Sequence, residues 1–140
     1  MADFDLERFI AAQAPVYRRV ESELDRGRKE SHWMWFVFPQ IAGLGSSPTA
    51  RHFALSGAEE ARAFLAHPLL GARLRDCTRL VLEHRDRTAE QIFGPVDALK
   101  FRSSMTLFDA VAGGASPFAE ALEGICGGER DRATLERLAD

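Results

Sequence analysis

The chain has 140 residues, 46% of them hydrophobic, and its 18 Lys and Arg against 21 Asp and Glu give a formal net charge of -3. This length and apolar content predict a single domain, residues 1–140, with one core. The basic residues are scattered along the chain, which argues against binding to a nucleic-acid backbone. No stretch approaches the roughly 20 apolar residues of a membrane span, and the start MADFDLERF is acidic where a secretory signal is basic. We therefore expect a cytoplasmic protein.

The first part of the chain shows helical periodicity on either side of Pro15. Apolar residues recur there at three- and four-residue steps, which predicts two short helices with one buried stripe each. Pro15 removes an amide and marks the break between them, and Gly27 ends the second helix. The apolar residues that form the two stripes are Leu6, Phe9 and Ile10, then Tyr17, Val20 and Leu24.

After an aromatic segment, residues 30–40, the chain returns to helix signals. Gly43 and Gly45 predict a tight loop, and Ser47-Pro48 has the order of a helix start. No segment alternates apolar and polar residues over the length of a strand, apart from an ambiguous few residues in WMWFVF. The sequence thus predicts an all-α fold, a compact bundle of about seven short helices. Two of the later expected helices begin with a capping box: one opens at Ser56–Glu59 and ends before Pro68, and one covers 88–93 and opens at Thr88–Gln91. Between them we expect a central helix over 68–84. The remaining expected helices cover 97–112, with Leu99 among the apolar positions, and 116–125, and a last helix is capped by Asp131.

Cysteine and histidine spacing gives no sign of a metal centre. Cys77 and Cys126 have no CxxC or Cys/His ligand spacing around them, so we expect two buried free thiols. His32, His52, His67 and His84 form no HxxxH or HExxH pair. We predict no metal and no cofactor.

The segment ESHWMWFVFPQ, residues 30–40, contains more aromatic surface than one buried helix face can absorb. On a helix, Trp33, Phe36 and Val37 would share a face, while His32 and Trp35 would point elsewhere. One interpretation is that the segment is core alone. The other is that it is core and also the wall of a pocket, because an indole stacks well on a planar heterocycle.

A second candidate lies in DALKFRSSMTLFD, residues 97–109. Lys100, Ser103 and Ser104 stand at i, i+3 and i+4 and should share one helix face. A cation beside two hydroxyls can hold a phosphate or a carboxylate. The same pattern also fits a solvated face, although two Ser inside a helix lower its propensity.

Several blocks of this sequence resemble a known family. RKESHWMWFVFPQIAGLG, HPLLGARL, IFGPVDALKFRSSMTLF and TLERL look like the uncharacterised bacterial family called domain of unknown function 1810, whose members are often mislabelled calpastatin. The resemblance covers nearly the whole chain and implies a compact all-helical fold. A more distant likeness, in short aromatic and Lys-containing blocks, is to the YbiA-like proteins linked to ADP-ribose derivatives. Calpain inhibition has no support, because that type of inhibitor would be disordered.

Two functional hypotheses follow, and the sequence leaves open whether the protein is an enzyme. The first is a pocket that binds or hydrolyses a nucleotide-derived, ADP-ribose-like small molecule, with hydrolysis of an N-glycosidic bond as the concrete reaction. The alternative is a non-catalytic protein-interaction module built on the aromatic segment and the following loop. The first hypothesis assigns Glu30 and His32 as the catalytic acid/base groups and Trp33, Trp35, Gln40, Lys100, Ser103 and Ser104 as ligand-binding residues.

Overall fold

The computed structural model describes residues 3–139, and these residues form ten helices and no β-strand. The predicted all-α class is therefore confirmed. Seven of the ten helices have seven or more residues, in agreement with the expected bundle of about seven short helices. In chain order the helices are α1 (Glu7–Gln13), α2 (Tyr17–Asp25), α3 (Met34–Val37), α4 (Pro48–Phe53), α5 (Ala58–Ala66), α6 (Pro68–Leu82), α7 (Ala89–Phe93), α8 (Pro95–Ala112), α9 (Pro117–Gly124) and α10 (Arg132–Ala139).

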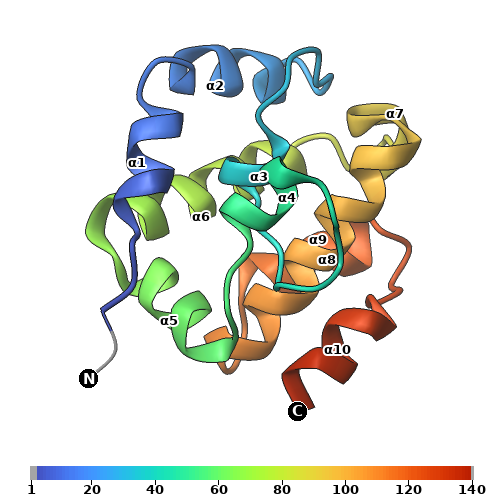
Figure 1. Cartoon of the computed structure of the whole chain (residues 1–140). Coiled ribbons are helices and arrows are strands. Elements are labelled where there is room, and N and C mark those ends of the chain that lie inside the picture. Colours follow the sequence, from blue (N-terminus) through green and yellow to red (C-terminus); the bar gives the residue numbers. More distant parts are fainter. Residues whose placement is uncertain (1–2, 140) are drawn as a thin grey trace.

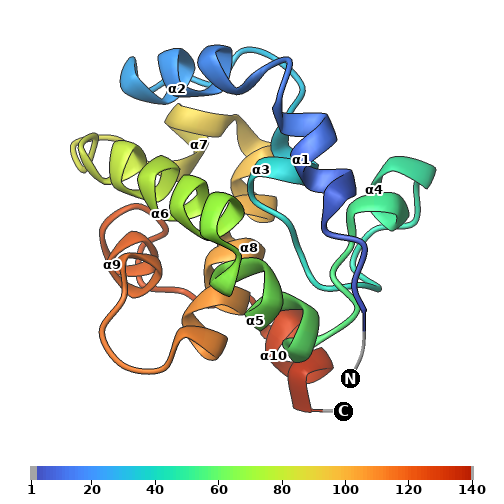
Figure 2. The same ribbon diagram turned by 90° about the vertical axis from the view of Figure 1, so that its left-hand side faces the viewer.

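The longest helix, α8, is the centre of the bundle. It packs against α5, α7, α9, α10 and α3, and α6 packs against α2, α5 and α9 (Figure 1). Because neighbours cover α8 on most sides, its buried positions include polar residues such as Ser104 and Thr106 as well as Phe101, Met105 and Phe108. The first described residues, before α1, and the end of α10 both lie at the lower end of the molecule (Figure 2).

Side-chain caps explain where several helices begin. The predicted capping box of α7 is confirmed, because Thr88 Oγ1 accepts from the Gln91 amide and Gln91 Oε1 accepts from the Thr88 amide. Ser47 and Ser116 each cap a helix whose first residue is proline, as Ser47-Pro48 predicted. Local sequence thus determines these helix starts.

The predicted Ser56–Glu59 capping box is wrong. Gly57 is the N-cap of α5, and Glu60, rather than Glu59, turns back to accept from the Ser56 amide at 2.7 Å. Glu60 is held in this position by Arg8 of α1, whose Nη1 lies 3.0 Å from its carboxylate. A contact between distant segments therefore determines the start of α5.

Helix α8 also differs from the prediction at its first turns. It begins at Pro95 instead of Asp97, because Gly94 adopts φ +84° and ends α7 immediately before it. Leu99, expected among the apolar positions of this helix, is 59% exposed. The reason is that this face near the start of α8 borders a cavity, which Leu99 lines together with Val96.

Cys77 and Cys126 are buried free thiols, as predicted. Burial raises the pKa of Cys77 to about 12 and that of Cys126 to about 11, so both stay protonated at neutral pH. Among residues 3–139, no helix has the length and apolar character needed to cross a membrane.

Candidate ligand-binding site

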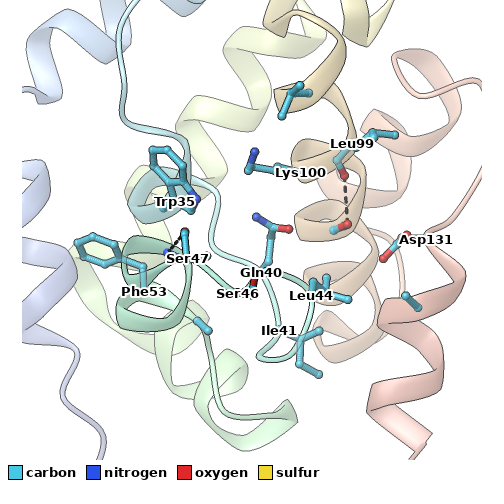
Figure 3. A pocket seen from close by; sticks show the side chains of 16 residues that line it. Trp35, Gln40, Ile41, Leu44, Ser46, Ser47, Phe53, Leu99, Lys100 and Asp131 are labelled. Carbon is cyan, nitrogen blue, oxygen red and sulfur yellow. Dashed lines mark hydrogen bonds between the residues drawn. The ribbon is translucent and has the colours of Figure 1, made fainter.

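A cavity of about 560 Å³ lies between the first half of α8 and the segment that runs from α3 to α4. The first residues of α10 close it on a third side (Figure 3). Its volume is in the range of pockets that hold small molecules. The side chains that line it include Trp35, Gln40, Leu44, Phe53, Leu99 and Lys100.

The aromatic segment divides between core and cavity. Trp33 is 1% exposed and lies in the core, where its indole N–H donates to Glu23 at 2.9 Å. Trp35, two residues further on, is partly exposed and lines the cavity. Trp33 is the N-cap of the short helix α3, with a φ of −137°, and Trp35 is the second residue of this helix, so the start of α3 directs one ring into the core and the other toward the cavity. Trp33 is therefore placed away from any ligand in this cavity.

Phe38, which directly follows α3, fixes the segment against the central helix. Its ring lies 5.0 Å from Phe101 of α8 and 6.0 Å from Phe93 of α7, edge-on in both cases. Such pairs stabilise the packing beyond the area that they bury. As a result α3 is held beside α8, with Trp35 facing the side chain of Lys100.

Glu23 anchors the beginning of the same segment. Its carboxylate, 2% exposed, accepts from the amides of Glu30 and Ser31, from the Ser31 hydroxyl and from the Trp33 indole. Burial alone raises the pKa of Glu23, but these four donors outweigh it and lower the pKa from 4.5 to about 2. An ionised carboxylate at the end of α2 thus holds residues 30–33 in place.

Lys100 is the cation of the cavity. Its ammonium lies 5.5 Å from the centre of the Trp35 ring, within cation–π range, and 3.5 Å from Asp97. Asp97 is at the same time bound to Lys29 at 2.7 Å, so the two lysines of the chain share one carboxylate. The group carries one positive charge in excess, and Lys100 holds the longer of the two contacts.

Of the two predicted serines, only Ser103 shares the cavity with Lys100. Ser103 lines the cavity, but its hydroxyl donates to the Leu99 carbonyl within the helix at 3.1 Å. Ser104 is fully buried, and its hydroxyl has no hydrogen-bond partner among the described residues. Of the two serines, only Ser103 is next to a ligand in this cavity.

Glu30 and His32 lie outside the cavity. His32 is exposed, and Glu30 is exposed with an ion pair of 3.8 Å to Arg26. Glu30 lines a separate depression with Arg26, Arg28 and Arg87. The structure therefore brings together Trp35, Gln40, Lys100 and Ser103, and leaves Glu30, His32, Trp33 and Ser104 away from them.

Sequence reasoning missed several residues of the cavity. Ser46 and Ser47 come from the glycine-containing loop, Phe53 from α4, Leu99 from α8 and Asp131 from the cap of α10. The Ser47 hydroxyl accepts from Ala50, and Asp131 accepts from the Thr134 amide and hydroxyl. Asp97 stands three residues before Lys100, a spacing that is typical of an ion pair on a helix. Nothing in the sequence predicts the second contact of Asp97, which is with Lys29.

The fold and the cavity define an all-α protein with a small-molecule-sized pocket between its central helix and a loop. The chain belongs to the family described as "Protein of unknown function (DUF1810)", which matches residues 3–138. The resemblance in the sequence blocks is thereby confirmed.

One solved structure is similar to this protein over nearly the whole chain. The chain is 54% identical to the conserved hypothetical protein Rv1873 from Mycobacterium tuberculosis, with a TM-score of 0.91 and 98% of each chain covered. A comparison with curated proteins finds no match. Function must therefore be inferred from the cavity itself.

Proposed function

We propose that the cavity binds a small anionic molecule with a planar ring, of the nucleotide-derived, ADP-ribose-like class. The observation that carries the proposal is the convergence of Trp35 and Lys100 from separate elements on one concave space. A ring stacked on the indole and an anion at the ammonium would be neighbours, as they are in a nucleotide.

The ion-pair group of Lys100 favours an anionic ligand at that side of the cavity, away from Asp131 on the opposite side. Lys29 and Lys100 together carry two positive charges, and Asp97 supplies one negative charge. A phosphate at Lys100 would form a charge-assisted hydrogen bond and neutralise the excess charge. Because the Lys100 side chain is already 22% exposed toward the cavity, little rearrangement is required.

The remaining polar groups suit the edges of a base or sugar. Gln40 lies between Trp35 and the loop and carries both a donor and an acceptor (Figure 3). Ser46 and Ser47 are exposed on the same loop. A few polar groups among apolar walls are typical of small-molecule sites.

The proposal is for binding rather than hydrolysis. Glu30 and His32, the predicted acid/base pair, do not line this cavity. The carboxylate that does, Asp131, is hydrogen-bonded to Thr134 as the cap of α10. Among the described residues that line the cavity, the one carboxylate is thus engaged as a helix cap, and we propose no hydrolytic step.

Tryptophan fluorescence tests the proposal. ADP-ribose should change the emission of the wild-type protein, and Trp35→Phe should abolish the change although Trp33 still emits. Lys100→Gln should weaken binding by about tenfold to a hundredfold, the value of a hydrogen bond to a charged group. Arg79→Gln, which removes an exposed cation elsewhere, is the matched control. Equal binding by wild type and Lys100→Gln, or a response that persists in Trp35→Phe, contradicts the proposal.

Amine labelling gives a second test. Lys29 has only 6% of its side chain exposed, so an amine-reactive reagent should modify Lys100 and spare Lys29. Bound ADP-ribose should protect Lys100, as read by mass spectrometry of the peptides. Labelling of Lys100 that saturating ligand does not slow would count against the site.

The alternative function, a non-catalytic protein-interaction module, is favoured by one observation. Val96 and Leu99 are exposed side by side on α8 at the cavity. Under this alternative no small nucleotide-derived molecule binds, and substitution of Leu99 affects only association with another protein. The fluorescence titration distinguishes the two functions.

A further inference from the structure

The first two turns of α8 present two large apolar side chains to solvent. Val96 is 65% exposed and Leu99 is 59% exposed, the highest values among large hydrophobic residues in the described part of the chain. They stand three residues apart and so lie on one helix face. Both line the same cavity as Trp35 and Lys100.

Leu99 and Lys100 divide the cavity into two halves. Lys100 points toward Trp35, whereas Leu99 points away from both of them, to the side of α8 on which Asp131 lies (Figure 3). Leu44 lines the cavity on the side of Leu99. One half therefore offers a cation and an indole. The other half offers the aliphatic side chains of Leu99 and Leu44, beside an Asp131 carboxylate that is already hydrogen-bonded to Thr134.

We infer that the ligand is an amphipathic anion, in which the charged group at Lys100 is joined to an uncharged ring or acyl group that covers Val96 and Leu99. This inference rests on the proposed function and specifies the ligand class. Removing exposed aliphatic surface from water is favourable in proportion to the apolar area covered. A hydroxyl-rich sugar covers such surface poorly, because its own polar groups lose water without gaining partners.

A small ligand fits this surface better than a protein partner. Val96 and Leu99 belong to a concave space of about 560 Å³ that also contains the Lys100 ammonium. Stable protein–protein interfaces need about 800 Å² from each partner, and two side chains beside a cavity supply only a small part of that. The continuity with Lys100 points to one molecule that occupies both halves.

Calorimetry with two probes tests the inference. ADP-ribose ends in a free ribose, whereas reduced nicotinamide adenine dinucleotide has the same phosphates and an uncharged second ring in that position. We expect the dinucleotide to bind the wild-type protein about tenfold more tightly, the effect of covering one aliphatic side chain. Leu99→Ser should remove this preference, so that the two probes bind the variant with equal affinity.

The control variant is Leu69→Ser, which changes a partly exposed leucine on α6 that does not line the cavity. Leu69→Ser should keep the preference, and circular dichroism should show that both variants are folded. If ADP-ribose binds in a Lys100-dependent manner but the dinucleotide binds no more tightly, the inference is overturned and the proposed function stands. The inference is overturned in the same way if Leu99→Ser keeps the preference. If neither probe binds, the proposed function fails, and the inference fails with it.

Discussion

The carboxylate of Glu23 should contribute a large share of the stability of this small protein, and Glu23→Gln measures it. Glutamine has the same shape, so its carbonyl oxygen can still accept from the amides of Glu30 and Ser31 and from the Trp33 indole, as Glu23 Oε1 does. Its amide nitrogen can donate to the Ser31 hydroxyl, which can rotate to accept. The substitution therefore removes the negative charge and keeps the arrangement of hydrogen bonds.

The expected loss follows from the pKa of Glu23. Burial alone raises this pKa, but the hydrogen bonds from Ser31, Glu30 and Trp33 bring it down from 4.5 to about 2. A lowering of this size corresponds to about 3 kcal/mol of preference for the ionised form in the folded state. Glu23→Gln should lower the free energy of unfolding at pH 7 by a similar amount, a large fraction of the total for a domain of this size.

The sign of the pH dependence is determined by the same shift. Because the folded pKa is below the unfolded value, the contribution of Glu23 is fully present above about pH 4.5 and is lost as the pH falls from there to about 2. The difference between wild type and Glu23→Gln should thus be largest at neutral pH and nearly vanish near pH 2. Comparing the two proteins at each pH cancels the titration of the other carboxylates.

Urea denaturation followed by circular dichroism at pH 7, 4 and 3 measures this difference. Glu21→Gln is the control, since Glu21 is exposed on the same helix and has no hydrogen bond to residues 30–33. If Glu23→Gln were as stable as wild type at pH 7, or if the difference did not shrink in acid, the carboxylate would not hold the segment.

Three further substitutions test the packing. Leu74→Ala, at a position 1% exposed on α6, should lower the free energy of unfolding by about 2–5 kcal/mol in a denaturant titration; a change near zero would mean that α6 is not central. Gly71→Ala should lower stability by about 1–3 kcal/mol, because the new methyl group would lie 2.1 Å from the Leu65 carbonyl oxygen. A higher melting temperature, as helix propensity alone predicts for this change, would refute that contact. Ser104→Ala should keep or raise the melting temperature, because its buried hydroxyl has no partner to lose; a clear decrease would reveal a hydrogen bond.

The helices were predictable where the signal is local. The capping box at Thr88 and Gln91 and the serine-proline pairs at Ser47 and Ser116 act within one turn, so the sequence contains the whole interaction. The start of α5 was not predictable in this way, because the position of Glu60, the residue that turns back, depends on its ion pair with Arg8, 52 residues earlier in the chain. Periodicity likewise shows which residues are apolar, but the exposure of Leu99 depends on which neighbours cover α8.

The sequence predicted the kinds of residue that line the candidate site better than it predicted the individual residues. The excess of aromatic rings in residues 30–40 indicated that some would line a cleft, and Trp35 does line one. Trp33 could not be separated from Trp35 without the position of Glu23, which accepts its indole N–H. In the sequence, Ser103 and Ser104 were equally good candidates for the site. In the structure, Ser104 points into the core and Ser103 lines the cavity, because α8 is buried on nearly all sides.

The segment from Lys29 to Trp35 connects the stability of the fold to the geometry of the cavity. Glu23 holds its backbone, and Lys29 joins it to Asp97, which also contacts Lys100. Removing the Glu23 charge weakens these hydrogen bonds without rearranging them, so it should loosen the segment that leads to Trp35 and weaken ligand binding as well as stability. Removing Lys100 or Leu99, both next to open space, deletes little packing and should affect binding alone. Substitutions in the core should therefore change both stability and the cavity, whereas substitutions of side chains that face the cavity should leave stability nearly unchanged, because these side chains contribute little to the core.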